Sequence, residues 1–164
     1  MHFEVEQKID APRDVVERAF LEPGFYEVLA EMEDFKVTGT VDPDRGEDTV
    51  HVRYAFTGSV AAPVRAFIDP SKLSWSVHAE VDLSDHSTAF TLVPDQFADR
   101  LKLSYAYRFL KKGQTTRQLV TGDLGVRLPI PVGGKAIEKA MAGGICEHLA
   151  KEARFIERWA LDQR

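Results

Sequence analysis

The sequence has little cysteine and no long apolar run, and both absences exclude classes of protein. Cys146 is the only cysteine among the 164 residues, so no internal disulfide can form, which is typical of a reducing compartment. No stretch approaches the roughly 18 consecutive apolar residues of a membrane-spanning helix. The first residues show no basic segment followed by an apolar core, so no secretory signal is predicted and we expect a cytoplasmic protein.

Positive charge is also scarce, because 21 lysines and arginines face 26 acidic residues and leave a net charge of −5. This balance argues against nucleic acid as a partner, since binding to phosphates needs a cationic surface. The bases concentrate in residues 99–127, where seven of them accompany two acids. That segment is interpreted either as the solvated outer faces of strands or as a docking face for an acidic partner or, in transient contact, an anionic membrane.

Motifs that hold metals or phosphates are missing as well. There is no HExxH sequence and no pair of cysteines, so neither a metal nor any other cofactor is predicted. No nucleophile elbow is present, and the glycines of GDLG and VGGK lack the spacing of a phosphate loop. Gly133 and Gly134 either offer free N–H groups to an anion at a helix start or ease the turn after Pro131.

The beginning of the sequence predicts a strand and two short helices. His2–Asp10 alternates between apolar and polar residues, which is typical of a half-buried strand. Asp10 is a candidate N-cap, and Pro12 suits the first turn of the helix that follows. Pro23-Gly24 is expected to break this helix, and the apolar residues within 25–32 predict a second one.

The middle of the sequence has a period of two, with short turns that favour an antiparallel meander. The predicted strands are Phe35–Val41, Val50–Phe56, Leu73–Val81, Thr88–Val93, Leu101–Phe109 and Thr115–Leu128, the first two joined by a turn through Asp42–Gly46. Residues 59–70 fit either a short helix or an irregular edge. Gly122 and Gly125 predict a bulge or bend in the last strand. Without βαβ repetition or a linker, residues 1–164 are expected to form a single domain.

After the exit of the chain from the sheet at Leu128–Pro131, the period becomes helical. From about Val132 to Leu161 a single apolar stripe runs along a helix that would be about 45 Å long. The stripe contains Ile137, Met141, Ile145, His148, Glu152, Phe155 or Ile156, and Trp159. A helix of this length with one apolar side needs a broad surface to lie on, which the predicted sheet supplies. The order of elements therefore indicates an α+β fold.

Four segments carry a resemblance to a known superfamily. The first two are VEQKIDAPRDVVERAFLEPGFYEVL and GDLGVRLPIPVGGKAIEKAMAGGICEHLAKEARFIERW, which resemble the opening and the closing of START-like proteins, a superfamily with birch-pollen-allergen-like, polyketide cyclase and lipid-transfer members. DPSKLSW and LPIPVGGKAIE resemble, more narrowly, a bacterial family of unknown function within it. The resemblance implies a helix-grip fold, in which a curved seven-stranded antiparallel sheet wraps around a long C-terminal helix, with two short helices after the first strand and a ligand cavity between sheet and helix.

Such a cavity needs apolar side chains on the inner face of the sheet and a few polar groups that orient a ligand. The candidate ligand-binding residues are Tyr54, Phe56, Trp75, Val77, Phe90, Leu92, Tyr105, Tyr107, Met141, Ile145 and His148. Alternatively, the same residues fill a solid core. Gly143-Gly144 costs helix stability, and we favour close approach of the helix to the sheet over room for a ligand as the reason.

His148 is the one weak catalytic candidate, because it lies one turn before Glu152 and a carboxylate can hold an imidazole as a general base. The alternative is a hydrogen-bonded or hydrated histidine at the edge of the stripe. The other histidines lie on outward strand faces or in a turn, where no chemistry is expected, and Cys146 is expected to be buried and inert.

We therefore expect a binding protein for a small hydrophobic or amphipathic ligand, such as a lipid, a sterol-like molecule, a polyketide or an aromatic metabolite. Phe25 and Tyr26 of the second short helix are predicted to gate the cavity. Two alternatives remain open. One is a cavity enzyme of the cyclase or hydrolase type that uses His148 and a tyrosine. The other is a protein-interaction module with a filled core that docks through its basic strands.

Overall fold

The computed structural model describes residues 1–38, 42–44, 48–60, 62–127 and 133–163. The exit of the chain from the sheet at Leu128–Pro131 and the helix start at Val132 lie outside these residues, as does part of the predicted turn through Asp42–Gly46. The predicted strands Phe35–Val41 and Thr115–Leu128 and the ambiguous segment 59–70 also extend beyond the described residues.

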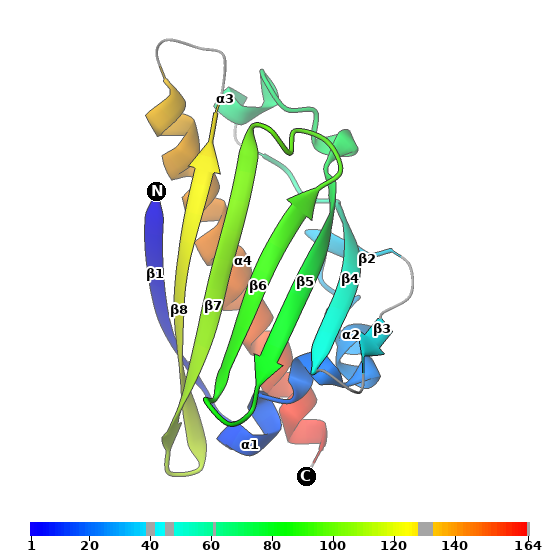
Figure 1. Cartoon of the computed structure of the whole chain (residues 1–164), viewed down its shortest axis with the longest axis vertical. Coiled ribbons are helices and arrows are strands. Elements are labelled where there is room, and N and C mark those ends of the chain that lie inside the picture. Colours follow the sequence, from blue (N-terminus) through cyan, green and yellow to red (C-terminus); the bar gives the residue numbers. More distant parts are fainter. Residues whose placement is uncertain (39–41, 45–47, 61, 128–132, 164) are drawn as a thin grey trace.

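The strands form one antiparallel sheet in the order β1-β8-β7-β6-β5-β4-β2, with the short β3 also paired to β4 (Figure 1). The bounds are His2–Ile9 for β1, Phe35–Val37 for β2, Asp42–Asp44 for β3, Thr49–Phe56 for β4, Ser74–Asp82 for β5, Ser87–Pro94 for β6, Leu101–Lys112 for β7 and Thr115–Val126 for β8. Each neighbouring pair follows the predicted meander, and β1 closes the sheet against β8.

Two short strands share the edge formed by β4. Val37 of β2 lies opposite Tyr54, whereas Asp42 of β3 lies opposite His51, so the register changes by two residues between them. Counted as one interrupted edge strand, β2 and β3 complete the seven-stranded sheet that the sequence predicts. The prediction of a single strand over Phe35–Val41 is confirmed only as far as Val37, because residues 39–41 lie outside the described chain.

Three short helical segments follow β1: α1 (Arg13–Val16), the 3-10 turn η1 (Ala19–Leu21) and α2 (Pro23–Leu29). Asp10 does not cap α1, because the N-cap position belongs to Pro12 and carries no side-chain hydrogen bond. Pro23 opens α2 instead of merely breaking α1, as suits a residue whose missing N–H costs nothing in a first turn. All three segments lie beside the C-terminal end of the long helix (Figure 1).

Residues 59–70, ambiguous in the sequence, contain the short helix α3 (Ala62–Arg65) and the first residue of the 3-10 turn η2 (Pro70–Lys72). The carboxylate of Asp69 accepts a hydrogen bond from the backbone N–H of Ser71 at 3.0 Å and so caps η2. Val64 and Ile68 pack with Ile137 of the long helix in a small apolar cluster of their own. This cluster anchors the N-terminal part of the helix, at the opposite end from α1 and α2 (Figure 1).

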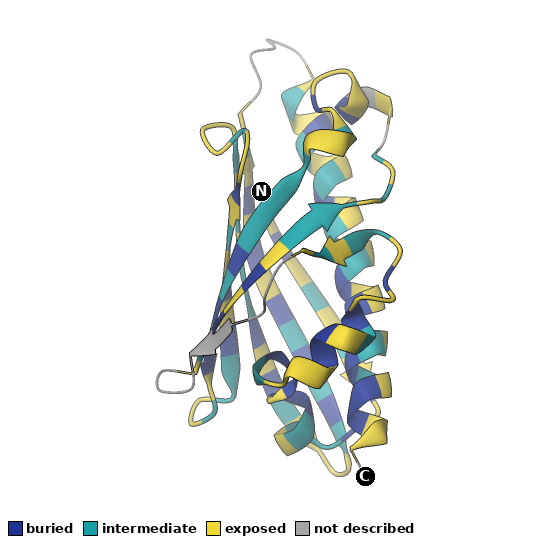
Figure 2. Ribbon diagram, turned by 90° about the vertical axis from the view of Figure 1, so that its right-hand side faces the viewer, coloured by how far each residue is buried: buried dark blue, intermediate teal, exposed yellow. Residues whose placement is uncertain are grey.

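The long helix α4 spans Gly134–Asp162, or 29 residues, and crosses the inner face of the sheet. At 1.5 Å per residue it is about 44 Å long, as predicted. Its burial is uneven along its length (Figure 2). Leu149, Ala153 and Ile156 are fully buried, whereas Met141 and Ile145 of the predicted stripe are only half-buried. The stripe therefore faces two environments.

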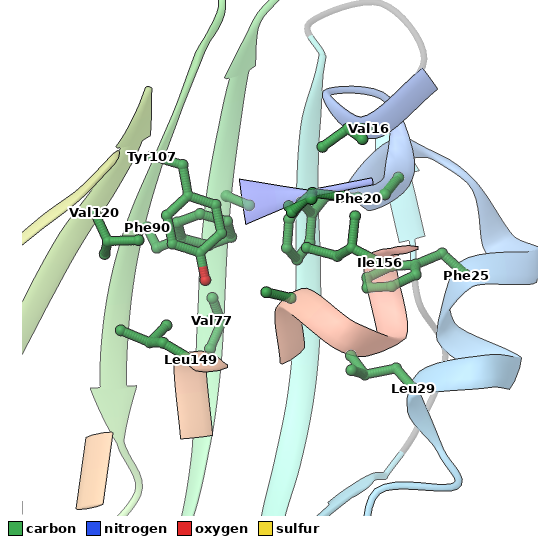
Figure 3. Packing of buried hydrophobic residues seen from close by; sticks show 14 of the residues in the cluster. Val16, Phe20, Phe25, Leu29, Val77, Phe90, Tyr107, Val120, Leu149 and Ile156 are labelled. Carbon is green, nitrogen blue, oxygen red and sulfur yellow. The ribbon is translucent and has the colours of Figure 1, made fainter. Parts of the chain in front are cut away.

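One environment is a packed core at the end that carries α1 and α2 (Figure 3). There Phe20 lies edge-on to Phe90, with ring centroids 4.9 Å apart, and Phe25 lies edge-on to Trp159 at 6.0 Å. Val16 and Ile156 belong to the same cluster of buried residues. The sheet and α4 are held together here by apolar burial, the main favourable contribution to folding.

The structure shows why the last strand, β8, contains glycine at position 122, where the sequence predicted a bulge or bend. The pairing of β8 with β1 and β7 runs through Gly122 without interruption, so the predicted bulge is wrong. A Cβ at Gly122 would lie 2.3 Å from the Phe3 ring and 2.8 Å from Tyr105 Cβ. Glycine is needed because side chains of both neighbouring strands close over this position. Gly125 has no such contact, since its nearest neighbour would be Lys102 Cβ at 4.0 Å.

Candidate ligand-binding cavity

A cavity of about 390 Å³ lies between the inner face of the sheet and the N-terminal two thirds of α4. Its wall is largely apolar and comes from inward residues of the strands, from α3 and from one side of α4. The packed core closes one end, and the cluster of Val64, Ile68 and Ile137 lies at the other. Core and cavity, which the sequence posed as alternatives, therefore occupy different parts of the same interface.

Every residue predicted to bind a ligand lines this cavity except Tyr107. The structure thus brings together ten side chains from four strands and from α4. Tyr107 has only 1% of its surface exposed and lies behind the wall, against Phe20 and Phe90 (Figure 3). It follows Tyr105 on the same face of β7, but the packing of η1 over that end of the sheet covers it.

Aromatic side chains form much of the wall. Tyr54 and Trp75, directly opposite each other on β4 and β5, are stacked with an angle of 21° between their rings. Phe90 and Tyr105 stack in the same way on β6 and β7. Flat walls of this kind suit a flat or elongated apolar ligand.

Phe35 is a wall residue that the sequence did not single out. Its ring lies edge-on to Trp75 at 5.2 Å and 4.0 Å from the imidazole of His148, so it links the edge of the sheet to α4. No local pattern could have found this contact, because β2 and α4 are distant in sequence. Leu101 and Leu103 also line the cavity, and the alternation that selected Tyr105 would have selected them.

A polar cluster is defined by Tyr107, His148 and Glu152, of which His148 and Glu152 interrupt the apolar lining. Glu152 is 5% exposed, and its Oε1 accepts a hydrogen bond from the Tyr107 hydroxyl. His148 lies one turn earlier on α4, with its Nε2 3.7 Å from the other carboxylate oxygen, Oε2. The Nδ1 of His148 is buried and has no hydrogen-bond partner among the described residues. The histidine thus faces the cavity rather than bulk water, with 20% of its side chain exposed.

The tyrosines around this cluster stay protonated. Burial raises the pKa of Tyr107 well above its usual value of 10.0, and the negative charge of Glu152 raises it further. The same two causes raise the pKa of Tyr105, and for Tyr54 burial is again the larger cause. Each hydroxyl therefore remains a hydrogen-bond donor at physiological pH. Tyr54 and Tyr105 make no side-chain hydrogen bond within the described chain and lie in the cavity wall.

The mouth of the cavity is bordered by charged and small residues. Lys151 Nζ lies 2.5 Å from the carboxylate of Asp34, and Glu147 and Gly144 lie on the same side of α4. A Cβ at Gly143 or Gly144 would meet no described atom within 4 Å. The close approach of helix and sheet that we favoured for these glycines is therefore wrong. Open space, which for Gly144 is the cavity itself, lies beside them instead.

The predicted gate at Phe25 and Tyr26 also needs correction. Phe25 is fully buried, and the Tyr26 hydroxyl donates to the backbone carbonyl of Phe20 at 2.8 Å. Neither residue lines the cavity, although Leu29 and Met32, at and just beyond the end of α2, do so. Side chains that are packed this tightly belong to the core and not to an opening.

Apart from the polar cluster, the described chain offers few groups suited to metal binding or to nucleophilic chemistry. No group of three or more histidine, cysteine or acidic side chains comes together as a metal site within it. Cys146 is only partly buried, contrary to the prediction, but this burial still raises the pKa of its thiol, as suits an unreactive cysteine. Within the same residues, no helix is long and apolar enough to span a bilayer. The cavity is therefore the candidate functional site of the described residues.

Solved structures from several organisms share this architecture along nearly the whole chain. TTHA0849 from Thermus thermophilus is 19% identical, with a TM-score of 0.67 and 99% of each chain covered. The Zhui aromatase/cyclase from Streptomyces sp. R1128 is 14% identical, with a TM-score of 0.67 and coverage of 98% of this chain and 93% of its own. Norcoclaurine synthase from Thalictrum flavum, in complex with dopamine and hydroxybenzaldehyde, is 15% identical, with a TM-score of 0.66 and coverage of 100% and 88%.

These likenesses confirm the helix-grip fold that the resemblance of the sequence motifs implied. No curated protein matches the sequence significantly. A family model does match it, over residues 4–160, and so includes both the sheet and most of α4. The chain belongs to the family described as Protein of unknown function (DUF2505).

Proposed function

We propose that this protein binds a small hydrophobic or amphipathic molecule in the cavity between the sheet and α4. The observation that carries the proposal is a cavity of about 390 Å³ with a mostly apolar wall and one polar cluster. Small-molecule sites have volumes of roughly 300–1,000 Å³ and combine apolar walls with a few polar groups. Burial of ligand surface would contribute about 25 cal/mol per Å² of apolar area.

Proteins with the same fold support this proposal. One solved relative is an aromatase/cyclase, and another is norcoclaurine synthase in complex with two small aromatic molecules. The stacked pairs Tyr54–Trp75 and Phe90–Tyr105 offer comparable flat surfaces here. Aromatic metabolites, polyketides and sterol-like molecules are thus the ligand types that we propose first, together with lipids.

Two glycine variants test the proposal by native mass spectrometry of gently purified protein. Gly144→Leu places a side chain at the cavity mouth, whereas Gly143→Leu places the same side chain one residue away, outside the lining. Both replace a helical glycine, so both should stabilise α4 to a similar degree. We expect a bound mass in the wild type and in Gly143→Leu, and a reduced one in Gly144→Leu.

The same experiment can contradict the proposal. If no variant carries a bound mass, and none gains one after incubation with naphthalene-sized aromatic compounds, the cavity is not a binding site. A bound mass that Gly144→Leu leaves unchanged would place the ligand elsewhere on the protein.

Acid–base catalysis in the same cavity is a second candidate, favoured by the position of His148. Its Nε2 lies 3.7 Å from Glu152 Oε2, so a modest rotamer change would let the carboxylate orient the ring. Conversion of a bound compound to a product of different mass, abolished in His148→Phe, would establish it. The remaining alternative, an interaction module with a filled core, disagrees with the open cavity.

A further inference from the structure

The polar cluster leaves one strong hydrogen-bond acceptor unused. Glu152 Oε1 accepts from Tyr107, but Oε2 has no hydrogen-bond donor within the described chain, since His148 Nε2 at 3.7 Å is too distant. Oε2 is not among the buried atoms without a partner, so it is accessible from the cavity and must find its hydrogen-bond donor there. Glu152 lines the cavity, so a ligand there can supply the missing donor.

The charge of the lining decides against an anionic ligand. Asp34, Glu147 and Glu152 line the cavity, and the one lysine among its lining residues, Lys151, is already paired with Asp34. A carboxylate or phosphate brought to Glu152 would lose its hydration and meet a like charge in a medium of low dielectric constant. Fatty acids and phosphorylated headgroups are therefore poor matches for the inner end of this cavity.

The position of the two ring nitrogens of His148 narrows the choice of ligand further. Its Nδ1 is buried without a partner among the described residues. A ring nitrogen without a partner can remain an acceptor, whereas an N–H there would be an unused donor, so the ring geometry favours a proton on Nε2. That proton then lies on the nitrogen next to Glu152 Oε2. A donor and an acceptor thus stand side by side, 3.7 Å apart.

A single hydroxyl oxygen satisfies both groups at once, since it accepts from one neighbour and donates to another. An ammonium group could donate to Glu152 but could not accept from His148. We propose that the ligand is an uncharged alcohol or phenol whose hydroxyl donates to Glu152 Oε2 and accepts from His148 Nε2. This inference rests on the proposed function and names the chemical class that the cavity selects.

Isothermal titration calorimetry with four naphthalene probes at neutral pH tests the assignment. The probes are 2-naphthol, 2-methoxynaphthalene, 2-naphthoate and 2-naphthylmethylammonium, which share one apolar body. We expect 2-naphthol to bind about tenfold or more tightly than 2-methoxynaphthalene, because only the former donates to the buried carboxylate. The anion should bind more weakly than 2-naphthol, and so should the ammonium.

Two variants test whether Glu152 and His148 cause the preference for 2-naphthol over 2-methoxynaphthalene. Glu152→Gln keeps an oxygen that Tyr107 can reach but removes the charge, so the preference for 2-naphthol over 2-methoxynaphthalene should fall several-fold. His148→Phe keeps a ring beside Phe35 but removes the donor, and it should reduce the same preference. Gly143→Leu, remote from the cluster, should leave the preference as it is in the wild type.

Failure of the inference differs from failure of the proposed function. If all four probes bind with similar affinity and Gly144→Leu weakens them all, the cavity binds ligands but the hydroxyl assignment is wrong. If 2-naphthoate or 2-naphthylmethylammonium binds most tightly of the four probes, the hydroxyl assignment is also wrong, although the cavity still binds ligands. If no probe binds, or if Gly144→Leu changes nothing, the proposed function fails and the inference fails with it.

Discussion

The hydroxyl of Tyr107 on β7 donates a hydrogen bond to the carboxylate of Glu152 on α4, although 45 residues separate them in the sequence. Both side chains are almost completely buried, so the bond joins the two layers of the fold at the inner end of the cavity. It keeps a carboxylate inside an otherwise apolar interface. The stability of the fold therefore depends on this pair, and so does the proposed choice of ligand.

Replacement of Tyr107 by phenylalanine should destabilise the protein by about 1–3 kcal/mol, because a buried carboxylate oxygen loses its donor. Urea denaturation monitored by circular dichroism measures the loss. Tyr105→Phe is the matched control, since that hydroxyl has no side-chain hydrogen bond within the described chain and lies on the same strand. Equal losses in the two variants would mean that the bond to Glu152 contributes nothing.

Gly122→Ala should destabilise the protein by about 1–3 kcal/mol, because the new methyl group would collide with the Phe3 ring and with Tyr105. Thermal unfolding gives the change in melting temperature. Gly125→Ala lies on the same strand with open space around it and should be close to neutral. A neutral Gly122→Ala would show that β1 moves aside without cost.

Gly143→Ala should stabilise the protein by about 0.5–1 kcal/mol, because alanine loses less backbone entropy in a helix and its methyl group meets no described atom within 4 Å. Chemical denaturation of the wild type and the variant gives the difference. A destabilised Gly143→Ala would indicate a contact that this position makes outside the described residues.

All four tyrosines of the sequence should resist alkaline titration until the protein unfolds. Burial is the largest cause that raises the pKa of Tyr26, Tyr54, Tyr105 and Tyr107 above 10.0. The folded state therefore holds these protons at a pH where the unfolded chain releases them. The stability linked to them is complete below about pH 10 and falls as the pH rises above it.

Absorbance at 295 nm, which reports tyrosinate, and circular dichroism, which reports folding, test this together. We expect both signals to change in one coincident transition above about pH 10. A tyrosine that titrates near pH 10 while circular dichroism remains native would contradict the burial of its hydroxyl.

Much of the fold follows from local patterns. The alternation in β4 to β8 separates inner from outer residues because successive side chains of a strand point to opposite faces. The length of α4 and its apolar side follow from a period of 3.6 residues, and the motifs at the two ends of the chain indicate the superfamily. Strand alternation and helical period together selected ten of the residues that line the cavity.

Local patterns failed where distant segments meet. Tyr105 and Tyr107 share a strand face, yet one lines the cavity and the other is sealed beneath Phe20. Phe35 reaches His148 across the interface, and no spacing within β2 could have indicated it. The roles of Gly122, Gly143 and Gly144 were also mispredicted. The sequence shows that these positions carry no side chain, but only the structure shows which atoms surround them.

The sequence by itself determined the order of the elements, the inward faces of the strands and the length of α4, because each depends on neighbours within a few residues. Only the tertiary structure decided which part of the inner face packs solid and which stays open. The short helices after β1 fill one end of the interface, and farther along α4 the sheet and the helix enclose the cavity. There Glu152 and His148 face the cavity, and that placement depends on packing between segments that lie far apart in the sequence.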